Sequence, residues 1–203
     1  MHLKKGLKRI VFVLNRYDCC VANKVINGDQ CTITWHVDDL KISHREKTVV
    51  KEIIKEIEEV YGKMTVNHTD KHEYVGMHFE YLRNKKAVVF TMENHLEEAL
   101  DSFPDDTNKV VSTPAAVHLF EVDETCTKLT EKDRSIFHSI VAKLLFVSKR
   151  ARPDILVAVS YLTTRVSKAD EDDWKKLKRL LQYLRSTIKL KMTLSADSMS
   201  SVK

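Results

Sequence analysis

The chain is poor in glycine and has no long hydrophobic run, and both absences exclude classes of protein. Its 203 residues include only four glycines, none of them in a loop of the kind that wraps nucleotide phosphates. No apolar stretch is long enough to cross a membrane. The apolar run at residues 10–14 is too short for the core of a secretion signal and predicts a strand. We therefore expect an intracellular protein, cytoplasmic or nuclear, with no membrane partner.

Cysteine is scarce as well. The four cysteines show no spacing typical of metal ligands, and the adjacent pair Cys19 and Cys20 cannot easily form a disulfide with each other. We expect reduced thiols, as in a reducing compartment. No Ser-His-Asp or Cys-His arrangement indicates nucleophilic catalysis. A chain that is 43% hydrophobic and 31% charged is long enough for one or two domains with a real core.

Two adjacent carboxylates interrupt a pair of predicted strands. Asp38 and Asp39 follow the strand-forming run at residues 31–37 and precede residues 40–43, where apolar Leu40 and Ile42 resume the strand pattern. Tight hairpins usually contain Asn-Gly or Asp-Gly, and this one has no glycine. A solvated turn is the ordinary explanation for an Asp-Asp pair. A second explanation is a divalent cation, because oxygen ligands on adjacent residues suit Mg²⁺ or Mn²⁺. A strand at residues 21–26 and a turn at 27–30 complete a predicted antiparallel meander.

Several segments, in this order, resemble one family. They read Cys-Val-Ala-Asn-Lys-Val-Ile-Asn-Gly at 20–28, Cys-Thr-Ile-Thr-Trp-His-Val-Asp-Asp-Leu at 31–40, Tyr-Val-Gly-Met at 74–77, Thr-Pro-Ala-Ala at 113–116, Ala-Lys-Leu-Leu-Phe at 142–146 and Arg-Ala-Arg-Pro-Asp-Ile at 150–155. This order is similar to that of copia-type retrotransposon reverse transcriptases, which are RNA-directed DNA polymerases. The resemblance covers roughly residues 10 to 195 and implies an internal piece of a Pol polyprotein.

The resemblance implies an α+β fold. It predicts a partial polymerase palm, a small antiparallel sheet with a packed helix, followed by a helical thumb or connection segment. The implied divisions are the palm with its Val-Asp-Asp hairpin at 1–92, a thumb-like helix and connector at 93–129, a helical connection segment at 130–192, and the lead-in to an absent ribonuclease H domain at 193–203.

The same resemblance implies a site. Asp38 is the expected primary ligand, and Asp39 the secondary ligand, of two Mg²⁺ (or Mn²⁺) ions that bridge the primer 3′-hydroxyl and the incoming triphosphate. His36 stands where most members have Tyr and is expected to pack against the primer end. The segment that steadies the primer terminus is expected to be a strand formed by Tyr74, Val75, Gly76 and Met77. The implied partners are an RNA or DNA primer-template and deoxynucleoside triphosphates.

The chain departs from the family pattern in ways that bear on activity. The first catalytic Asp and the nucleotide-contacting segment of the family would lie upstream of residue 1, and neither Asp18 nor Asp29 matches that Asp. Cys19 stands where Pro is usual. We therefore expect the isolated chain to bind Mg²⁺ weakly and to be inactive. The alternative is a non-enzymatic, retrotransposon-derived remnant with weak, sequence-independent binding of nucleic acid; an unrelated basic interaction module would make the motif order a coincidence.

Basic residues gather in local clusters although the net charge is only +5. The residues expected to contact phosphates are Lys149, Arg150, Arg152, Lys175, Lys176, Lys178 and Arg179. Each cluster has a second interpretation as the solvated face of an amphipathic helix.

Capping signals predict the helices. Ser43 and Glu46 form a capping-box pattern before a helix that ends near Gly62. Strands are expected at 74–82 and 87–92, and a short helix at 93–103. Thr130 and Asp170 are predicted N-caps, and Pro153 is expected in the first turn of a helix. His68 and His72 lie in a segment without helical periodicity, which favours a surface loop over a metal site.

Overall fold

The computed structural model describes residue 7 and residues 10–196. The chain divides into two compact units, residues 1–69 and 70–203. Both contain an antiparallel sheet, so the fold class is α+β. The boundary lies well before the predicted one at residues 92 and 93. No helix of the described part is long and apolar enough to traverse a bilayer.

The first unit is built on an antiparallel sheet whose strands follow their order in the chain. The strands are β1 (Val13–Leu14), β2 (Val21–Ile26), β3 (Asp29–His36) and β4 (Asp39–Ser43). Asn27 and Gly28 connect β2 to β3 with φ angles of 54° and 84°. Two left-handed residues match the twist of a hairpin, so the Asn-Gly signal correctly predicts this turn.

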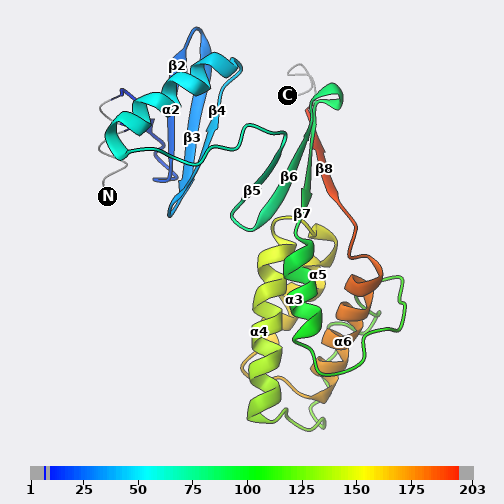
Figure 1. Ribbon diagram of the computed structural model, residues 1–203. Helices are drawn as coiled ribbons and strands as arrows, with labels where there is room; N and C mark the ends of the chain where they lie inside the picture. Colours follow the sequence, from blue (N-terminus) through cyan, green and yellow to red (C-terminus); the bar gives the residue numbers. More distant parts are fainter. Residues whose placement is uncertain (1–6, 8–9, 197–203) are drawn as a thin grey trace. The chain divides into compact units, whose positions relative to one another are not determined.

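One helix, α2 (Lys47–Tyr61), covers one face of this sheet (Figure 1). Its apolar stripe packs on every second residue of the strands, and the buried members of this core are Leu7, Phe12, Ala22, Cys31, Ile33, Trp35, Val49, Ile53 and Ile57. The predicted capping box is wrong, because Ser43 pairs with Thr32 at the end of β4 and Glu46 becomes the N-cap. Gly62 ends the helix as predicted, with φ at 87° and its N–H donating to the Glu58 carbonyl at 2.8 Å.

The second unit begins with its own antiparallel sheet. Its strands are β5 (Lys71–Tyr74), β6 (Met77–Leu82), β7 (Ala87–Thr91) and β8 (Met192–Ser195), with a short 3₁₀ turn, η1 (Arg83–Lys85), before β7. Residues 193–195 were expected to lead into another domain, and they lie instead in a strand paired with β7. This pairing places residues 70–92 in one unit with the helices, which explains the shifted boundary. Residues 197–203 of the expected lead-in fall outside the described part.

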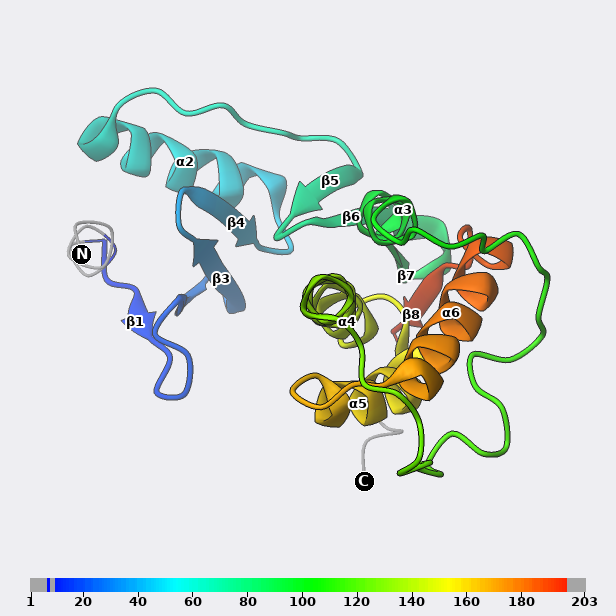
Figure 2. The same cartoon turned by 90° about the horizontal axis from the view of Figure 1, so that it is seen from below.

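Four α-helices complete the described part of the second unit. They are α3 (Glu93–Asp101), α4 (Glu131–Ser148), α5 (Leu156–Arg165), which follows η2 (Pro153–Ile155), and α6 (Glu171–Ser186). Figure 2 looks along α3 and α4 with α5 and α6 beside them. Thr130 accepts a hydrogen bond from the Asp133 N–H, and Asp170 forms a capping box with Asp173, so both predicted caps are confirmed. Pro153 opens η2, at the start of the helical turn predicted for it.

Candidate metal-binding hairpin and basic surfaces

The two predicted catalytic carboxylates lie at the tight connection between β3 and β4. His36 pairs with Asp39, so Val37 and Asp38 form a two-residue loop. Both aspartates are exposed. The predicted hairpin with accessible carboxylates is therefore confirmed, whereas a helix or a buried ion pair would have contradicted it.

Val37 adopts an unusual backbone conformation in this loop. Its φ is 53°, and its side chain is 81% exposed. Positive φ at the first loop position is normally reserved for glycine, and it is a true outlier for a β-branched residue. Such a residue stores about 1–3 kcal/mol of strain, and such strain clusters at functional sites.

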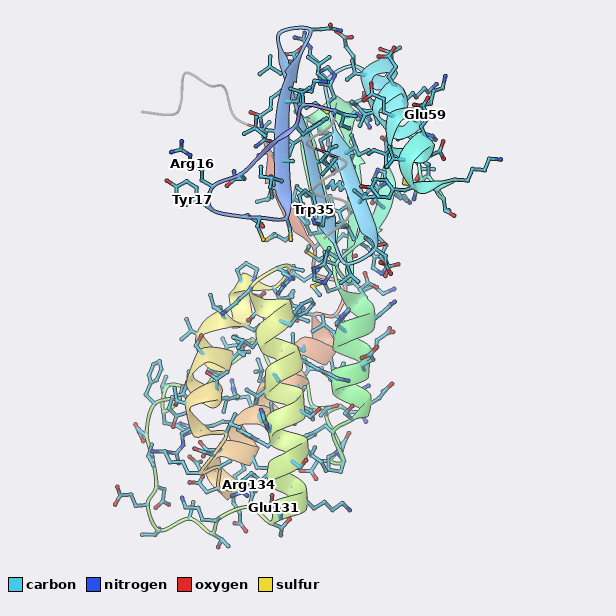
Figure 3. The ribbon with its side chains drawn as sticks, turned by 90° about the vertical axis from the view of Figure 1, so that its left-hand side faces the viewer. Arg16, Tyr17, Trp35, Glu59, Glu131 and Arg134 are labelled. Atoms are coloured by element: carbon cyan, nitrogen blue, oxygen red, sulfur yellow. The ribbon has the colours of Figure 1, made fainter. Side chains whose placement is uncertain are left out.

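The strand register places the paired residues on the open face of the sheet. Side chains alternate along β3, and the buried Trp35, labelled in Figure 3, belongs to the face under α2. His36 and its cross-strand partner Asp39 therefore lie on the opposite face, where Thr32 donates to Asn23 at 2.9 Å. This face is polar and carries the hairpin acids at one end.

The donor chemistry of the hairpin fits a hydrated divalent cation. Asp38 and Asp39 offer hard carboxylate oxygens, and Mg²⁺ is commonly held by one or two carboxylates together with water and substrate phosphates. Within the described residues, no third His, Cys, Asp or Glu converges on this pair, so an ion held here would need water or substrate oxygens for its remaining ligands.

A second group of possible metal ligands lies in the loop between β1 and β2. One carboxylate oxygen of Asp18 and the sulfurs of Cys19 and Cys20 lie within 4.8 Å of one another. The Cys20 N–H donates to Asp18 Oδ1 at 2.8 Å, which tightens the turn. Figure 3 shows the neighbouring Arg16 and Tyr17 directed away from the sheet. Spacing rules missed this group because they look for separated ligands, whereas these are consecutive.

The predicted primer-positioning strand is a hairpin turn instead. Tyr74 pairs with Met77, and the intervening Val75 and Gly76 have φ angles of 52° and 70°. A Cβ on Gly76 would lie only 2.8 Å from the His95 ring. Glycine is therefore favoured at this position for two reasons, the left-handed backbone and the close approach of the His95 ring on α3.

The tip of the β5–β6 hairpin packs against the aromatic rings of His95 and Phe146, and a guanidinium lies over the Phe146 ring. The His95 and Phe146 rings stack with centroids 5.6 Å apart, and the Arg150 guanidinium lies 3.7 Å from the Phe146 centroid. Arg150 also donates to the Phe146 carbonyl at 3.2 Å. This predicted phosphate-binding residue is thus partly engaged in holding the helix end.

Arg152 does not present its charge to solvent, contrary to the prediction. Its side chain is 2% exposed and donates to both carboxylate oxygens of Asp154 at 2.9 and 2.8 Å. It also donates to the Thr187 carbonyl at 3.0 Å. Burial alone would raise the pKa of Asp154, but the Arg152 hydrogen bonds and charge outweigh it and lower that pKa. Arg152 is a packing residue with its charge already neutralised.

Most of the predicted basic residues on α6 contact the connector, which we define as residues 102–130. Lys176 is buried, binds Asp172 at 2.8 Å and donates to the Glu121 carbonyl. Burial alone would lower the pKa of Lys176, but its interactions with Asp172 and Tyr161 outweigh burial and raise that pKa. Lys178 contacts Asp105 at 3.4 Å.

The prediction that Lys176 binds phosphate is therefore wrong. Arg179 also holds the connector, donating to Thr113 Oγ1 at 3.0 Å. Of the predicted basic residues, Lys149 and Lys175 are the ones that remain exposed.

Comparisons with known proteins identify relatives among retrotransposon proteins. The chain is 24% identical over 192 residues to the retrovirus-related Pol polyprotein from transposon TNT 1-94 of Nicotiana tabacum, a match covering 92% of this chain and 14% of that protein. It is 24% identical over 188 residues to a putative transposon Ty5-1 protein of Saccharomyces cerevisiae, covering 92% of this chain and 59% of the relative. A Pol polyprotein from transposon RE2 of Arabidopsis thaliana is 26% identical over 152 residues, or 75% of this chain and 10% of that protein.

The chain is therefore related to retrotransposon Pol polyproteins, and it spans less than two thirds of the length of each of these relatives. No family model matches the chain, and no solved structure matches it.

Proposed function

We propose that this chain is the hairpin-bearing part of a retrotransposon reverse transcriptase and contributes to RNA-directed DNA polymerisation within a longer protein. The observation that carries the proposal is the β3–β4 hairpin, where two exposed carboxylates follow a strained Val37 in a chain related to retrotransposon Pol polyproteins. The first unit would then be part of a polymerase palm, and the second unit its thumb and connection.

The residues of the hairpin have distinct roles in this proposal. Asp38 and Asp39 would hold Mg²⁺ through their carboxylate oxygens. When bound, the metal supplies positive charge that activates the primer hydroxyl and offsets charge on the leaving pyrophosphate. His36, directly across from Asp39, packs against the primer end on the open face of the sheet.

The proposal predicts that the 203-residue chain does not extend a primer. Phosphoryl-type transfer depends almost entirely on positioning and charge stabilisation, and the open Asp38–Asp39 pair supplies only part of both. The assay is primer extension on an RNA template with Mg²⁺ and, separately, Mn²⁺. A second, continuous chain adds the upstream polymerase segment of a relative; it should extend primers and lose activity by at least about a hundredfold on Asp38→Asn.

The control for this assay is Asp105→Asn, which removes a carboxylate in the connector. It should leave extension by the longer chain unchanged. Full activity of the Asp38→Asn variant would overturn the catalytic role. Extension by the 203-residue chain itself would show that its site is already complete.

A metal-binding measurement tests the hairpin site independently of polymerase activity. Mn²⁺ should broaden the amide NMR signals of residues 36–40 in the 203-residue chain, and Asp38→Asn with Asp39→Asn should abolish this broadening. Broadening that survives both substitutions would contradict the metal site.

A non-enzymatic nucleic-acid binder is the second candidate, and the burial of predicted phosphate contacts favours weak affinity. With Arg152 and Lys176 engaged internally, fewer of the predicted basic residues remain for phosphates. Binding through the remaining ones should fall with added salt because each phosphate contact releases counterions. A longer chain that binds primer-template but never extends it, with Asp38 intact and Mn²⁺ bound at the hairpin, would favour this candidate.

A further inference from the structure

Three consecutive residues in the loop between β1 and β2 place metal-ligating atoms close together. They are Asp18, Cys19 and Cys20, and one carboxylate oxygen and the two sulfurs lie within 4.8 Å of one another. Asp18 and Cys19 are exposed, and Cys20 is half-buried. Within the part of the chain that the structure describes, this is the place where three His, Cys, Asp or Glu side chains converge in this way. The cluster is therefore accessible to an ion from solvent.

Backbone hydrogen bonds hold this loop from both sides. Asn15 Oδ1 accepts from the Asp18 N–H at 3.2 Å. The Val21 N–H donates to the Asp18 carbonyl at 3.2 Å, which closes a turn around the two cysteines. From the neighbouring strand β3, the Trp35 N–H donates to the Cys20 carbonyl at 3.0 Å. Because folding of the sheet already orders the three ligands, little further conformational freedom is lost when an ion binds.

The chemistry of these donors favours a soft or borderline cation over Mg²⁺. Thiolates select ions such as Zn²⁺, whereas carboxylates and water suit Mg²⁺ and Mn²⁺. The Cys20 N–H donates to Asp18 Oδ1 at 2.8 Å, and an ionised carboxylate has further lone pairs for a cation.

The spacing of the two sulfurs is compatible with a tetrahedral zinc ion. Zn–S bonds are about 2.3 Å long, so two sulfurs at neighbouring corners of a tetrahedron lie about 3.8 Å apart. The observed separation is at most 4.8 Å, which exceeds this value by no more than about 1 Å. Rotation of the Cys19 or Cys20 side chain alone can close such a difference.

We propose that Asp18, Cys19 and Cys20 bind one Zn²⁺ ion through a carboxylate oxygen and two thiolates, with water in the fourth position. Zinc adopts three protein ligands and an open position where a further ligand can enter. Binding displaces the two thiol protons, which pass to the solvent. The site differs from the proposed Mg²⁺ site at Asp38 and Asp39 in its residues and in its metal preference, and it does not rest on the proposed function.

The strand register connects this cluster to the acidic hairpin. Trp35, which donates to the Cys20 carbonyl, pairs on its other side with Leu40 of β4, next to Asp39. The zinc cluster and the acidic hairpin therefore lie at the same end of one sheet. Zn²⁺ should accordingly shift the amide NMR signals of residues 18–21 most, and that of Trp35 less.

The first test measures the stoichiometry and affinity of Zn²⁺ for the 203-residue chain, kept reduced with a phosphine. Native mass spectrometry should show one Zn²⁺ per chain. In competition with a chromogenic chelator, Cys19→Ser and Cys20→Ser should each weaken binding by at least about tenfold, because each removes a ligand. Cys126→Ser is the matched control and should leave the affinity unchanged. Cys126 also contacts an aspartate, Asp123 at 3.4 Å, but has no adjacent cysteine in the chain.

Two outcomes of this test would overturn the proposal. Zn²⁺ shared between two chains would overturn a site within one chain. Wild-type affinity after Cys19→Ser and Cys20→Ser are combined would overturn the site itself. Circular dichroism checks that each variant is folded. Cys19 is exposed, so the Cys19→Ser result stands even if replacement of the half-buried Cys20 disturbs the fold.

The second test counts the ligands with Cd²⁺, whose thiolate complexes absorb in the ultraviolet. The absorption at saturation should fall to about half in Cys19→Ser and in Cys20→Ser, because one of two thiolates is lost. Asp18→Asn keeps both thiolates and an oxygen that can accept from the Cys20 N–H. It should leave the saturating absorption unchanged and weaken Cd²⁺ binding several-fold. Wild-type affinity in Asp18→Asn would overturn the carboxylate as a ligand.

A third measurement separates this site from the acidic hairpin. Asp38→Asn combined with Asp39→Asn should leave the Zn²⁺ affinity unchanged, and an excess of Mg²⁺ should not displace Zn²⁺. Loss of Zn²⁺ binding in that variant, or displacement by Mg²⁺, would overturn the assignment to Asp18, Cys19 and Cys20. Failure of primer extension, or of Mn²⁺ broadening at residues 36–40, would contradict the proposed function and leave the zinc site standing.

Discussion

The two units hold their charged side chains in different ways. In the first unit, Arg45 approaches Asp29 at 3.7 Å with its side chain 81% exposed. In the second, Arg165 is 5% exposed and donates to Asp173 at 2.9 Å and to Asp170 at 3.0 Å. Exposed ion pairs contribute little to the free energy of unfolding, whereas removing one partner of a buried ion pair is strongly destabilising. The candidate metal hairpin therefore belongs to a unit held mainly by one apolar layer, whereas the other unit is stabilised by buried polar networks.

Each unit contains one tryptophan, so the comparison can be tested within a single chain. Trp35 reports on the first unit and Trp174 on the second. Denaturation in urea, followed by fluorescence in Trp35→Phe and Trp174→Phe backgrounds, gives the free energy of unfolding of each unit separately.

The largest effect is expected at the Arg165 network. Arg165→Ala leaves two buried carboxylates without their cation and should reduce the stability of the second unit by about 3–5 kcal/mol. Lys128, which also contacts Asp170 at 3.2 Å, cannot compensate both acids. The matched change Arg45→Ala should cost the first unit less than about 0.5 kcal/mol. Equal losses in the two units would contradict the comparison.

An intermediate and pH-dependent effect is expected at Asp154. Asp154→Asn weakens the two charge-assisted bonds from Arg152 and should cost about 1.5–3 kcal/mol at neutral pH. The pKa of Asp154 is lower in the folded protein, so this stabilisation is fully present above the ordinary carboxyl pKa. It is lost as the pH falls below that value toward the folded pKa. Urea titrations at several pH values should show wild type and variant converging in acid; a constant difference would refute the coupling.

The smallest effect, and one of opposite sign, is expected at Val37. Glycine removes the strain of a positive φ, but it also increases the conformational entropy of the unfolded chain. Because the strain is the larger of the two effects, Val37→Gly should stabilise the first unit by up to about 1 kcal/mol. Val25→Gly is the control, at an exposed strand position whose φ is not positive, and should destabilise by about 0.5–1 kcal/mol. Urea midpoints from Trp35 fluorescence measure both. Equal destabilisation by the two changes would show that Val37 is unstrained.

Features specified by neighbouring residues were predictable from the sequence. The caps at Thr130 and Asp170 depend on a partner three positions away, and the Asp38–Asp39 hairpin depends on the strands that flank it. Ser43 carried the same capping signal, but pairing with Thr32 took it into β4. There, a longer-range interaction overrode a local preference.

Features specified by distant residues were not predictable. Arg152 is buried because it reaches Thr187, and Lys176 because it reaches the Glu121 carbonyl, partners separated by 35 and 55 residues. A charged run looks the same in a sequence whether it faces water or a returning loop.

The pairing of β7 with β8 has a consequence for synthesis on the ribosome. Val88 lies opposite Leu194, so β8 cannot pair with β7 until all of the intervening helices have been synthesised. The first unit contains its whole sheet within residues 1–69 and can fold much earlier. At ordinary translation speeds the delay is on the order of ten seconds. During that interval β7 presents an unpaired edge, so nascent chains of this protein should need the ribosome or a chaperone to keep that edge from pairing elsewhere.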